Sequence, residues 1–179
     1  MSAHAFLRAA TSAAHDQVDA LLSDYDLGDP ANYGRFLGIQ AAVFLPIEQA
    51  LDAAGAAAVI PDWPDRRRGA LLCEDIAALG IELPAPIEAP KFTTSDGILG
   101  GVYVLEGSRL GGSMLARSVG AGLPQRFLSG SPLRGGWKSL LSLLEHNLQS
   151  VVQREQAANS AIQTFGCFFR AASISEGIR

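Results

Sequence analysis

Apolar residues recur at the three- and four-residue spacing of a helix along most of the chain. The first stretch with this spacing predicts a helix over about residues 4–23. A second helix is expected to begin at Pro30, which follows the N-cap residue Asp29, and to end at Gly55. Pro46 lies inside that stretch and should kink it, because proline cannot donate the backbone hydrogen bond of a helix interior.

The rest of the chain shows the same helical spacing between clear breaks. A third helix should begin at the cap residue Asp65 and end at Gly80, and a proline-rich loop follows it. Pro124 and the Gly/Ser/Pro segment 129–136 interrupt the remaining pattern. The helices expected there cover residues 95–121, 137–148 and 151–174. Because neither an alternating strand pattern nor a repeat is found, we expect an all-α, single-domain protein over residues 1–179.

Composition narrows the class of protein. Hydrophobic residues make up 48% of the chain and charged residues 18%, which favours a compact fold. The net charge of −4 comes without a basic stripe, since Arg66, Arg67 and Arg68 are expected to form one solvated helix face, so nucleic acid is not an expected partner. Cys73 and Cys167 lack the spacing of metal ligands. With neither a spanning apolar run nor a secretory signal, we expect a reduced, cytoplasmic protein that does not enter a membrane.

Residues 103–112 contain three glycines in a stretch that is otherwise expected to be helical, Tyr-Val-Leu-Glu-Gly-Ser-Arg-Leu-Gly-Gly. Gly107, Gly111 and Gly112 together give up roughly 3 kcal/mol of helix stability relative to alanine. Tyr103, Gly107 and Gly111 fall on one helix face, which becomes a groove of bare backbone beginning at an aromatic hydroxyl. Two interpretations stay open at this point: a flat ligand lies in the groove, or another helix packs closely against it.

His15 is the one histidine within the apolar face of the first predicted helix. The row on this face is Leu7, Thr11, His15, Val18 and Leu22. Asp19 follows His15 by one turn, where a carboxylate could orient the imidazole so that its other nitrogen ligates a metal. Arg8 precedes it by two turns, roughly 10 Å along the axis, where it could hold an anion. An imidazole with a guanidinium at this distance suits an iron porphyrin and its propionates, although a core histidine bonded to Asp19 is also consistent.

Together the two segments resemble a known family. Residues 7–19, Leu-Arg-Ala-Ala-Thr-Ser-Ala-Ala-His-Asp-Gln-Val-Asp, are similar to the proximal helix of heme oxygenases. Residues 103–112 resemble the distal helix of the bacterial branch of that family. The length, the all-helical layout and the Pro-Asp-Trp-Pro segment at 61–64 also resemble the bacteriophytochrome-associated members, so the likeness extends over essentially the whole chain.

The resemblance implies a heme-oxygenase-like helical bundle in which heme b is sandwiched between a proximal and a glycine-rich distal helix. Heme would be both cofactor and substrate, cleaved with O₂ and electrons to biliverdin, CO and Fe²⁺. His15 would ligate the iron with Asp19 as its orienting partner, while Arg8 and Tyr103 would hold the propionates. The other residues expected at the heme are Thr11, Gly107, Ser108, Gly111, Gly112, Phe165 and Phe168.

The distal segment departs from the mammalian-type enzymes of this family, whose distal helix carries an aspartate that organises water. No aspartate occurs in residues 103–112. Arg109 should not replace it, because it lies about 200° around the helix from Gly107 and should point away from the heme. Ordered water must then be held by backbone or other side chains. Arg170 is a further candidate for a propionate contact, with a solvated charge as the alternative.

Two other functions remain open. One is a heme-binding or heme-trafficking protein of the same fold without turnover. The other is a helical protein with a di-iron centre or a thiamine-type substrate, and the di-iron version needs several histidines and carboxylates at helical spacing, whereas this chain has three scattered histidines. No flavin or nicotinamide motif is found, so we expect an external electron donor such as ferredoxin or a reductase, and a bacteriophytochrome as a candidate acceptor of biliverdin.

Overall fold

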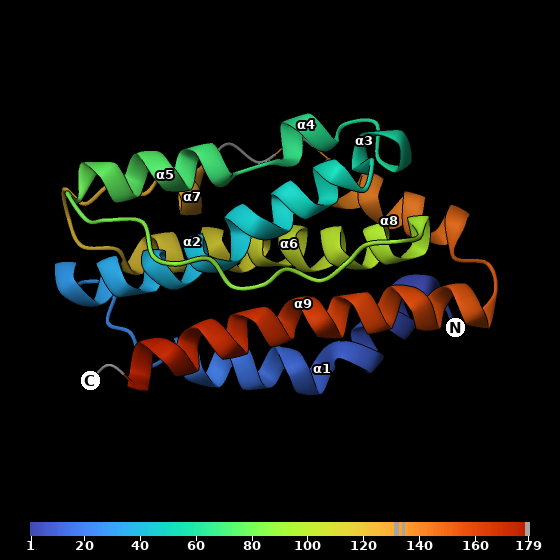
Figure 1. Ribbon diagram of the computed structural model, residues 1–179, viewed down its shortest axis with the longest axis horizontal. Coiled ribbons are helices and arrows are strands. Elements are labelled where there is room, and N and C mark those ends of the chain that lie inside the picture. The colour runs from blue at the N-terminus through green and yellow to red at the C-terminus, as the bar shows by residue number, and fades with distance from the viewer. Residues whose placement is uncertain (131–132, 134, 178–179) are drawn as a thin grey trace.

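The computed structural model describes residues 1–130, 133 and 135–177, and within these ranges it contains helices and no strand (Figure 1). The prediction of an all-α fold is confirmed for this part of the chain. The long helices are α1 (Ala3–Leu22), α2 (Pro30–Ala53), α5 (Gly69–Ala78), α6 (Ser95–Leu115), α8 (Gly136–Asn147) and α9 (Val151–Gly177). The short ones are α3 (Ala56–Val59), α4 (Trp63–Arg66), the 3₁₀ helix η1 (Ala116–Ser118) and α7 (Arg126–Ser129).

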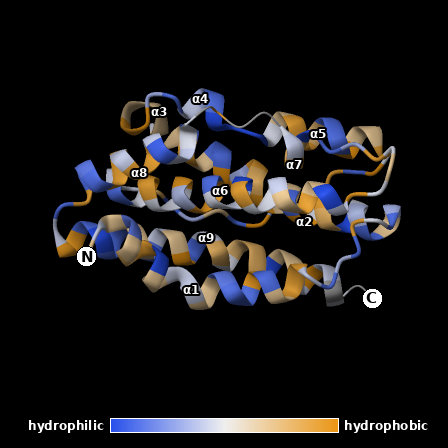
Figure 2. Ribbon diagram, turned by 180° about the vertical axis from the view of Figure 1, so that it is seen from behind, coloured by the Kyte–Doolittle hydropathy of each residue, from blue (hydrophilic) through white to orange (hydrophobic). Residues whose placement is uncertain are grey.

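Helix α9 is the centre of the packing. It lies against α6 on one side and α1 on the other, and α2 packs against both α9 and α5 (Figure 1). Hydrophobic and hydrophilic residues are interspersed along the helices, as expected for elements that each bury one face (Figure 2). The close approach of α6 and α9 requires a glycine, since a Cβ atom at Gly100 would lie 2.0 Å from the carbonyl oxygen of Ala157.

Capping hydrogen bonds fix the start of helix α1. Ser2 caps α1 by accepting a hydrogen bond from the amide of Ala5 at 3.1 Å. The Glu145 carboxylate on α8 accepts two more from the amides of Ala3 and His4, at 2.9 and 3.0 Å. These two bonds lower the pKa of Glu145. The start of α1 is therefore fastened to α8.

Several predicted boundaries are confirmed. Asp29 caps α2 through its side chain, Pro30 is the first residue of that helix, and Gly55 follows its end with a φ of 80°. Gly80 follows α5 with a φ of 68°. Helix α2 continues through Pro46.

Other boundaries are wrong. The third predicted helix is two helices, because Arg67 between α4 and α5 is extended with φ −65° and ψ 138°, and Asp65 lies inside α4 instead of capping it. Helix α6 ends at Leu115, short of residue 121, and passes into the 3₁₀ helix η1. The predicted break at 129–136 contains Ser129, the last residue of α7, and its residues 131, 132 and 134 lie outside the described residues.

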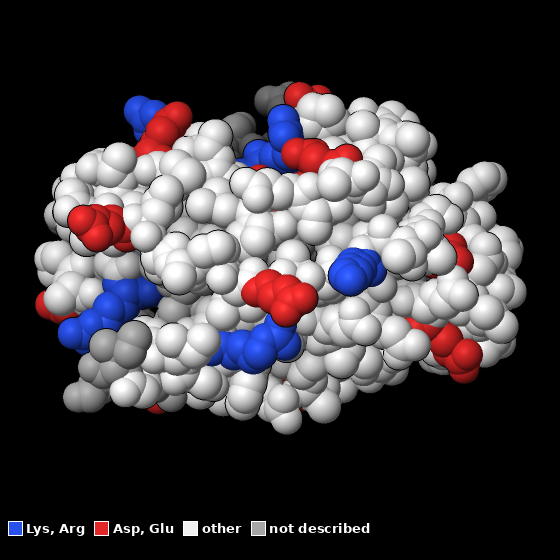
Figure 3. Space-filling view, viewed as in Figure 1, with Lys and Arg blue, Asp and Glu red and all other residues white. Residues whose placement is uncertain are grey.

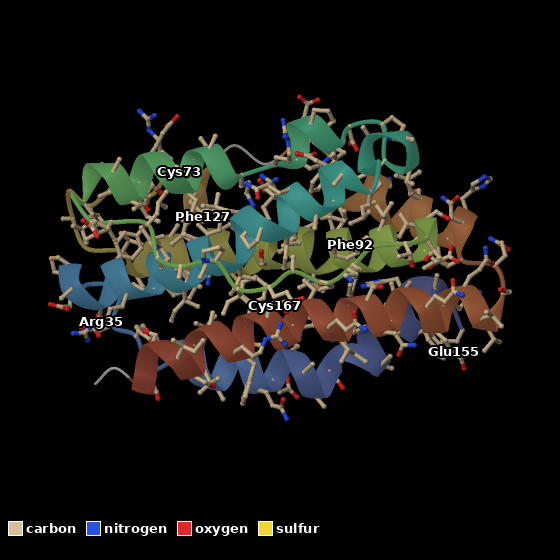
Figure 4. The ribbon with its side chains drawn as sticks, in the orientation of Figure 1. Arg35, Cys73, Phe92, Phe127, Glu155 and Cys167 are labelled. Atoms are coloured by element: carbon tan, nitrogen blue, oxygen red, sulfur yellow. The ribbon has the colours of Figure 1, made fainter. Side chains whose placement is uncertain are left out.

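The outer surface visible in Figure 3 is mainly neutral, with charged side chains scattered over it singly or in pairs of opposite sign. The two cysteines are free thiols, Cys73 on α5 and Cys167 on α9, in separate layers of the fold (Figure 4). In the part of the chain that the structure describes, no helix is long and apolar enough to cross a membrane.

Candidate functional site

A cavity of about 580 Å³ lies between α1 and α6. Its volume is within the range of pockets that hold cofactors and other small ligands. Helices α2, α7, α8 and α9 complete its wall. Apart from Arg170, the site residues predicted from the sequence line this cavity: Arg8, Thr11, His15, Asp19, Tyr103, Gly107, Ser108, Gly111, Gly112, Phe165 and Phe168. The fold therefore brings together the two segments that the sequence singled out.

The His15 side chain lies on the α1 wall of the cavity. Its Nδ1 atom is 3.2 Å from Oδ2 of Asp19 and 3.7 Å from Oδ1 of Asp16, and its ring meets Phe165 edge-on at a centroid distance of 5.7 Å. Because 54% of the His15 side chain is exposed, the alternative of a core histidine bonded to Asp19 is wrong. Because Asp19 faces Nδ1, the Nε2 atom remains the one suited to ligate a metal.

The surroundings of the α6 glycines decide whether the groove is open to a flat ligand or filled by another helix. A Cβ atom at Gly107 or Gly111 would have no atom within 4 Å, although both residues line the cavity. At Gly112 a Cβ would touch the Leu128 side chain at 3.3 Å. Close packing against another helix thus explains Gly100 earlier in α6, whereas Gly107 and Gly111 keep the cavity wall bare.

One end of the cavity is aromatic and cationic. The Tyr103 ring lies 5.7 Å from the Trp137 ring and 6.1 Å from that of His4, measured between centroids. Burial raises the pKa of the Tyr103 hydroxyl, and the positive charge of Arg8 and the hydroxyl of Thr11 oppose that rise. Arg8 is exposed on the same stretch of wall. This end is suited to a ligand with carboxylates.

Gln40 on α2 lines the cavity and was missed by the sequence reasoning. Only 5% of the residue is exposed, and its side chain has no hydrogen-bond partner among the residues that the structure describes. No deeply buried side-chain nitrogen or oxygen in that part of the chain lacks a partner. The Gln40 amide must therefore reach the cavity surface, where it can bind a ligand or water. A glutamine within an apolar row is the one signal that could have found it.

Phe127 and Leu128 on α7 are further wall residues without a sequence signal. The buried Asp75 carboxylate on α5 accepts hydrogen bonds from the amides of Arg126 and Phe127 at 3.1 and 2.8 Å, and so caps this short helix. The Tyr33 hydroxyl donates to the carbonyl of Pro124 at 2.7 Å just before it. Hydrogen bonds with residues distant in sequence therefore hold Phe127 and Leu128 at the cavity wall.

The prediction that Arg66, Arg67 and Arg68 form one solvated helix face is wrong. Arg66 and Arg68 are each only 2% exposed, and Arg67 alone is exposed. Nη1 of Arg66 lies 2.9 Å from a carboxylate oxygen of Glu106, which also pairs with Arg109 at 3.0 Å. Buried carboxylate and carbonyl partners on other elements compensate the desolvated guanidinium groups. Arg109 is thus turned away from the cavity, as predicted.

Arg170 is not placed to meet a ligand in the cavity. Its Nη2 atom lies 3.4 Å from the carbonyl oxygen of Glu88 and 3.1 Å from the sulfur of Cys167. The contacts attach α9 to the loop between α5 and α6, outside the cavity wall. The proposed contact with a propionate is therefore wrong.

His15 is the residue best placed to ligate a metal in the cavity. Among the described residues, no three or more histidine, cysteine, aspartate or glutamate side chains come together as a site for a metal ion. His15 could serve as one ligand of a metal that a larger, flat group carries. The bare wall at Gly107 and Gly111 leaves room opposite His15 for such a flat group.

Comparisons with known proteins agree with this architecture. The crystal structure of the NO- and CO-bound heme oxygenase from Neisseria meningitidis has a similar fold, with a TM-score of 0.83 over 99% of this chain and 93% of that one, at 22% sequence identity. A heme oxygenase from Xanthomonas campestris pv. campestris (strain 8004) is 32% identical over 112 residues, which cover 59% of this chain and 67% of that protein. No family model matches the chain.

Proposed function

Since the chain belongs to the heme oxygenase family, we propose that it binds heme b in the cavity between α1 and α6 and cleaves it with O₂ and electrons to biliverdin, CO and Fe²⁺. The observation that carries this proposal is the pairing of His15 on one wall with bare glycine backbone on the other. Bound heme supplies both the iron that activates dioxygen and the ring carbons that are oxidised. The protein's part is to hold, orient and shield it.

His15 is the proposed proximal ligand, through Nε2. Oδ2 of Asp19 lies 3.2 Å from Nδ1, where it can accept a hydrogen bond from Nδ1–H and so fix the tautomer and the ring orientation. Phe165 meets the imidazole edge-on and limits its rotation. A neutral imidazole held in this way donates less electron density to iron than a cysteine thiolate does, which suits oxidation of the ring over oxidation of a second substrate.

Gly107 and Gly111 form the proposed distal surface. Their backbone can approach a bound ligand more closely than any side chain would permit. Strong acid–base side chains close to the iron promote cleavage of the O–O bond, so a surface without them keeps oxygen available for the ring. Ser108 and the Gln40 amide are the polar groups from which the chain can hold water in this part of the cavity.

Arg8 and Tyr103 are the proposed propionate anchors. Both lie at the same end of the cavity, and Thr11 lies beside Tyr103. A guanidinium and a phenol are suitable donors for carboxylates, and two fixed carboxylates set the rotation of an otherwise nearly symmetric disc. The choice of the ring carbon to be cleaved would follow from this anchoring.

Electrons are proposed to come from a separate ferredoxin or reductase, because the sequence contains no flavin or nicotinamide motif. A bacteriophytochrome is the proposed acceptor of biliverdin, on the resemblance of the chain to the members associated with such receptors. A carrier without turnover is the less favoured function, because it has no need of a bare surface at Gly107 and Gly111.

A pair of histidine variants tests the proposal. Hemin titrated into the wild-type protein should bind one to one and give the absorption spectrum of a histidine-ligated heme. His15→Ala should lose that spectrum and biliverdin formation, and added imidazole should restore part of both. His146→Ala is the matched control, since His146 is exposed on α8 outside the cavity, and it should behave like the wild type. The opposite pattern would exclude His15 as the ligand.

A further inference from the structure

Arg68, between α4 and α5, is a buried cation whose side chain ends at the distal helix. Its guanidinium carbon lies 4.8 Å from the ring centroid of Phe44 and 4.7 Å from that of Phe127, which itself lines the cavity. The Nη2 atom donates to the carbonyl oxygen of Leu105 at 2.8 Å and to the hydroxyl oxygen of Ser108 at 2.7 Å. Both acceptors lie on α6 within two residues of Gly107.

The backbone at Arg68 is also held by hydrogen bonds. The Glu48 carboxylate on α2 accepts hydrogen bonds from the amides of Arg68 and Gly69 at 2.7 and 3.0 Å. A Cβ atom at Gly69 would lie 2.6 Å from this carboxylate, so glycine permits the close approach. Helix α2 thus anchors the residue, and the residue in turn anchors α6.

Burial of this cation is unfavourable unless its contacts compensate for the lost water. Burial, followed by the nearby Arg109, lowers the pKa of Arg68 to about 9, which leaves the guanidinium charged at neutral pH. An apolar side chain of similar length could fill the space between Phe44 and Phe127. Such a residue could not provide the polar contacts that Arg68 makes to α6.

The contacts of Ser108 determine what its hydroxyl offers to the cavity. A hydroxyl has one proton and two lone pairs. The proton is donated to the carbonyl oxygen of Leu105 at 2.8 Å, and one lone pair accepts from Arg68. Ser108 lines the cavity, so what remains for a ligand or water there is a single acceptor and no proton.

We propose that Arg68 is a positioning residue of the heme site, which fixes α6 beside Gly107 and holds the Ser108 hydroxyl as a hydrogen-bond acceptor toward the cavity. Only the catalytic consequence of this inference rests on the proposed function; the fixing of α6 does not. Oxygen that takes up two electrons from the external donor and two protons leaves as hydrogen peroxide, with the heme intact. A group at Ser108 that only accepts a hydrogen bond orients cavity water without supplying such a proton. It also gives this chain a means of ordering water although residues 103–112 contain no aspartate.

The first part of the test uses the protein without heme. Amide hydrogen exchange of the peptide 105–112 should become about tenfold faster in Arg68→Met, because a hydrogen bond from a charged donor is lost. Arg68→Lys, which keeps the charge, should give an intermediate rate and covers the case in which the methionine variant fails to fold. Exchange in the middle of α2 should stay as in the wild type. Unchanged exchange at 105–112, or equal acceleration in both segments, would overturn the proposal.

The second part uses the hemin complex with reductant and oxygen. Arg68→Met and Ser108→Ala should each raise the hydrogen peroxide released per biliverdin formed, and the double variant should be no worse than Arg68→Met, because the two residues act through one contact. Additive effects would contradict the proposed coupling. If the wild type forms no biliverdin, the proposed function fails, whereas the exchange measurement without heme still decides whether Arg68 fixes α6.

Discussion

Replacing Gly107 and Gly111 by alanine separates the stability of α6 from the function of its bare surface. Both residues lie inside the helix, neither has a positive φ, and a Cβ atom at either position would contact nothing within 4 Å. The substitutions therefore remove the helix penalty of glycine without a steric penalty in the protein. The added methyl groups enter the wall of the cavity instead.

The expected gain in stability follows from helix propensity. Each glycine costs roughly 1 kcal/mol relative to alanine, so the double variant without heme should be more stable by about 2 kcal/mol. For a chain of this size, that corresponds to a rise in Tm of roughly 4–8 °C. Gly100→Ala is the matched control in the same helix, because its Cβ would lie 2.0 Å from the Ala157 carbonyl, and it should lower the stability by about 1–3 kcal/mol.

Urea unfolding of the three proteins without heme measures these changes, and hemin titration followed by turnover measures the functional effect. We expect the double variant to bind hemin more weakly and to form biliverdin more slowly although its fold is more stable. A double variant that binds and cleaves heme like the wild type would refute the reasoning, since the bare surface would then have no function. A loss of stability similar to that of Gly100→Ala would show that Gly107 and Gly111 serve packing.

Three further predictions concern single contacts. Arg8→Ala combined with Tyr103→Phe should weaken hemin binding by about fivefold for each lost contact of about 1 kcal/mol and mix the biliverdin isomers, which chromatography of the product would detect. Gln40→Leu should leave hemin affinity nearly unchanged and increase hydrogen peroxide release, as a peroxide assay during turnover would show, because the cavity loses a polar group that holds water. Glu145 has a lowered pKa in the folded protein, so its contribution to stability is present above the ordinary value of 4.5 and is lost as the pH falls through the folded pKa. Glu145→Gln should therefore lower the Tm at pH 7 and have little effect in acid below that pKa.

Much of the site could be predicted because its geometry is local. His15 and Asp19 are one helical turn apart, and the helix itself brings Nδ1 to 3.2 Å from the carboxylate. Tyr103, Gly107 and Gly111 likewise share one face of α6, and all three line the cavity. In both cases, helix periodicity alone determines which residues lie together.

The remaining contacts depend on residues far apart in the chain. Arg66 was expected to be solvated because the sequence does not show that Glu106, 40 residues later, lies within 2.9 Å of its guanidinium. Gln40 and Phe127 reach the cavity only because α2 and α7 pack beside it. The predicted cap at Asp65 fails for a local reason, since α4 already begins at Trp63 and the extended backbone at Arg67 separates it from α5.

The central claim is that the cavity between α1 and α6 holds heme while the protein directs oxygen to the ring. Its most direct test is to load purified protein with one equivalent of hemin, add an electron donor in air together with catalase, and measure biliverdin and CO. The account predicts one biliverdin and one CO per heme, with yields that catalase does not change, because oxygen reacts while bound in the cavity. Heme that remains intact, or whose breakdown catalase abolishes, would contradict it.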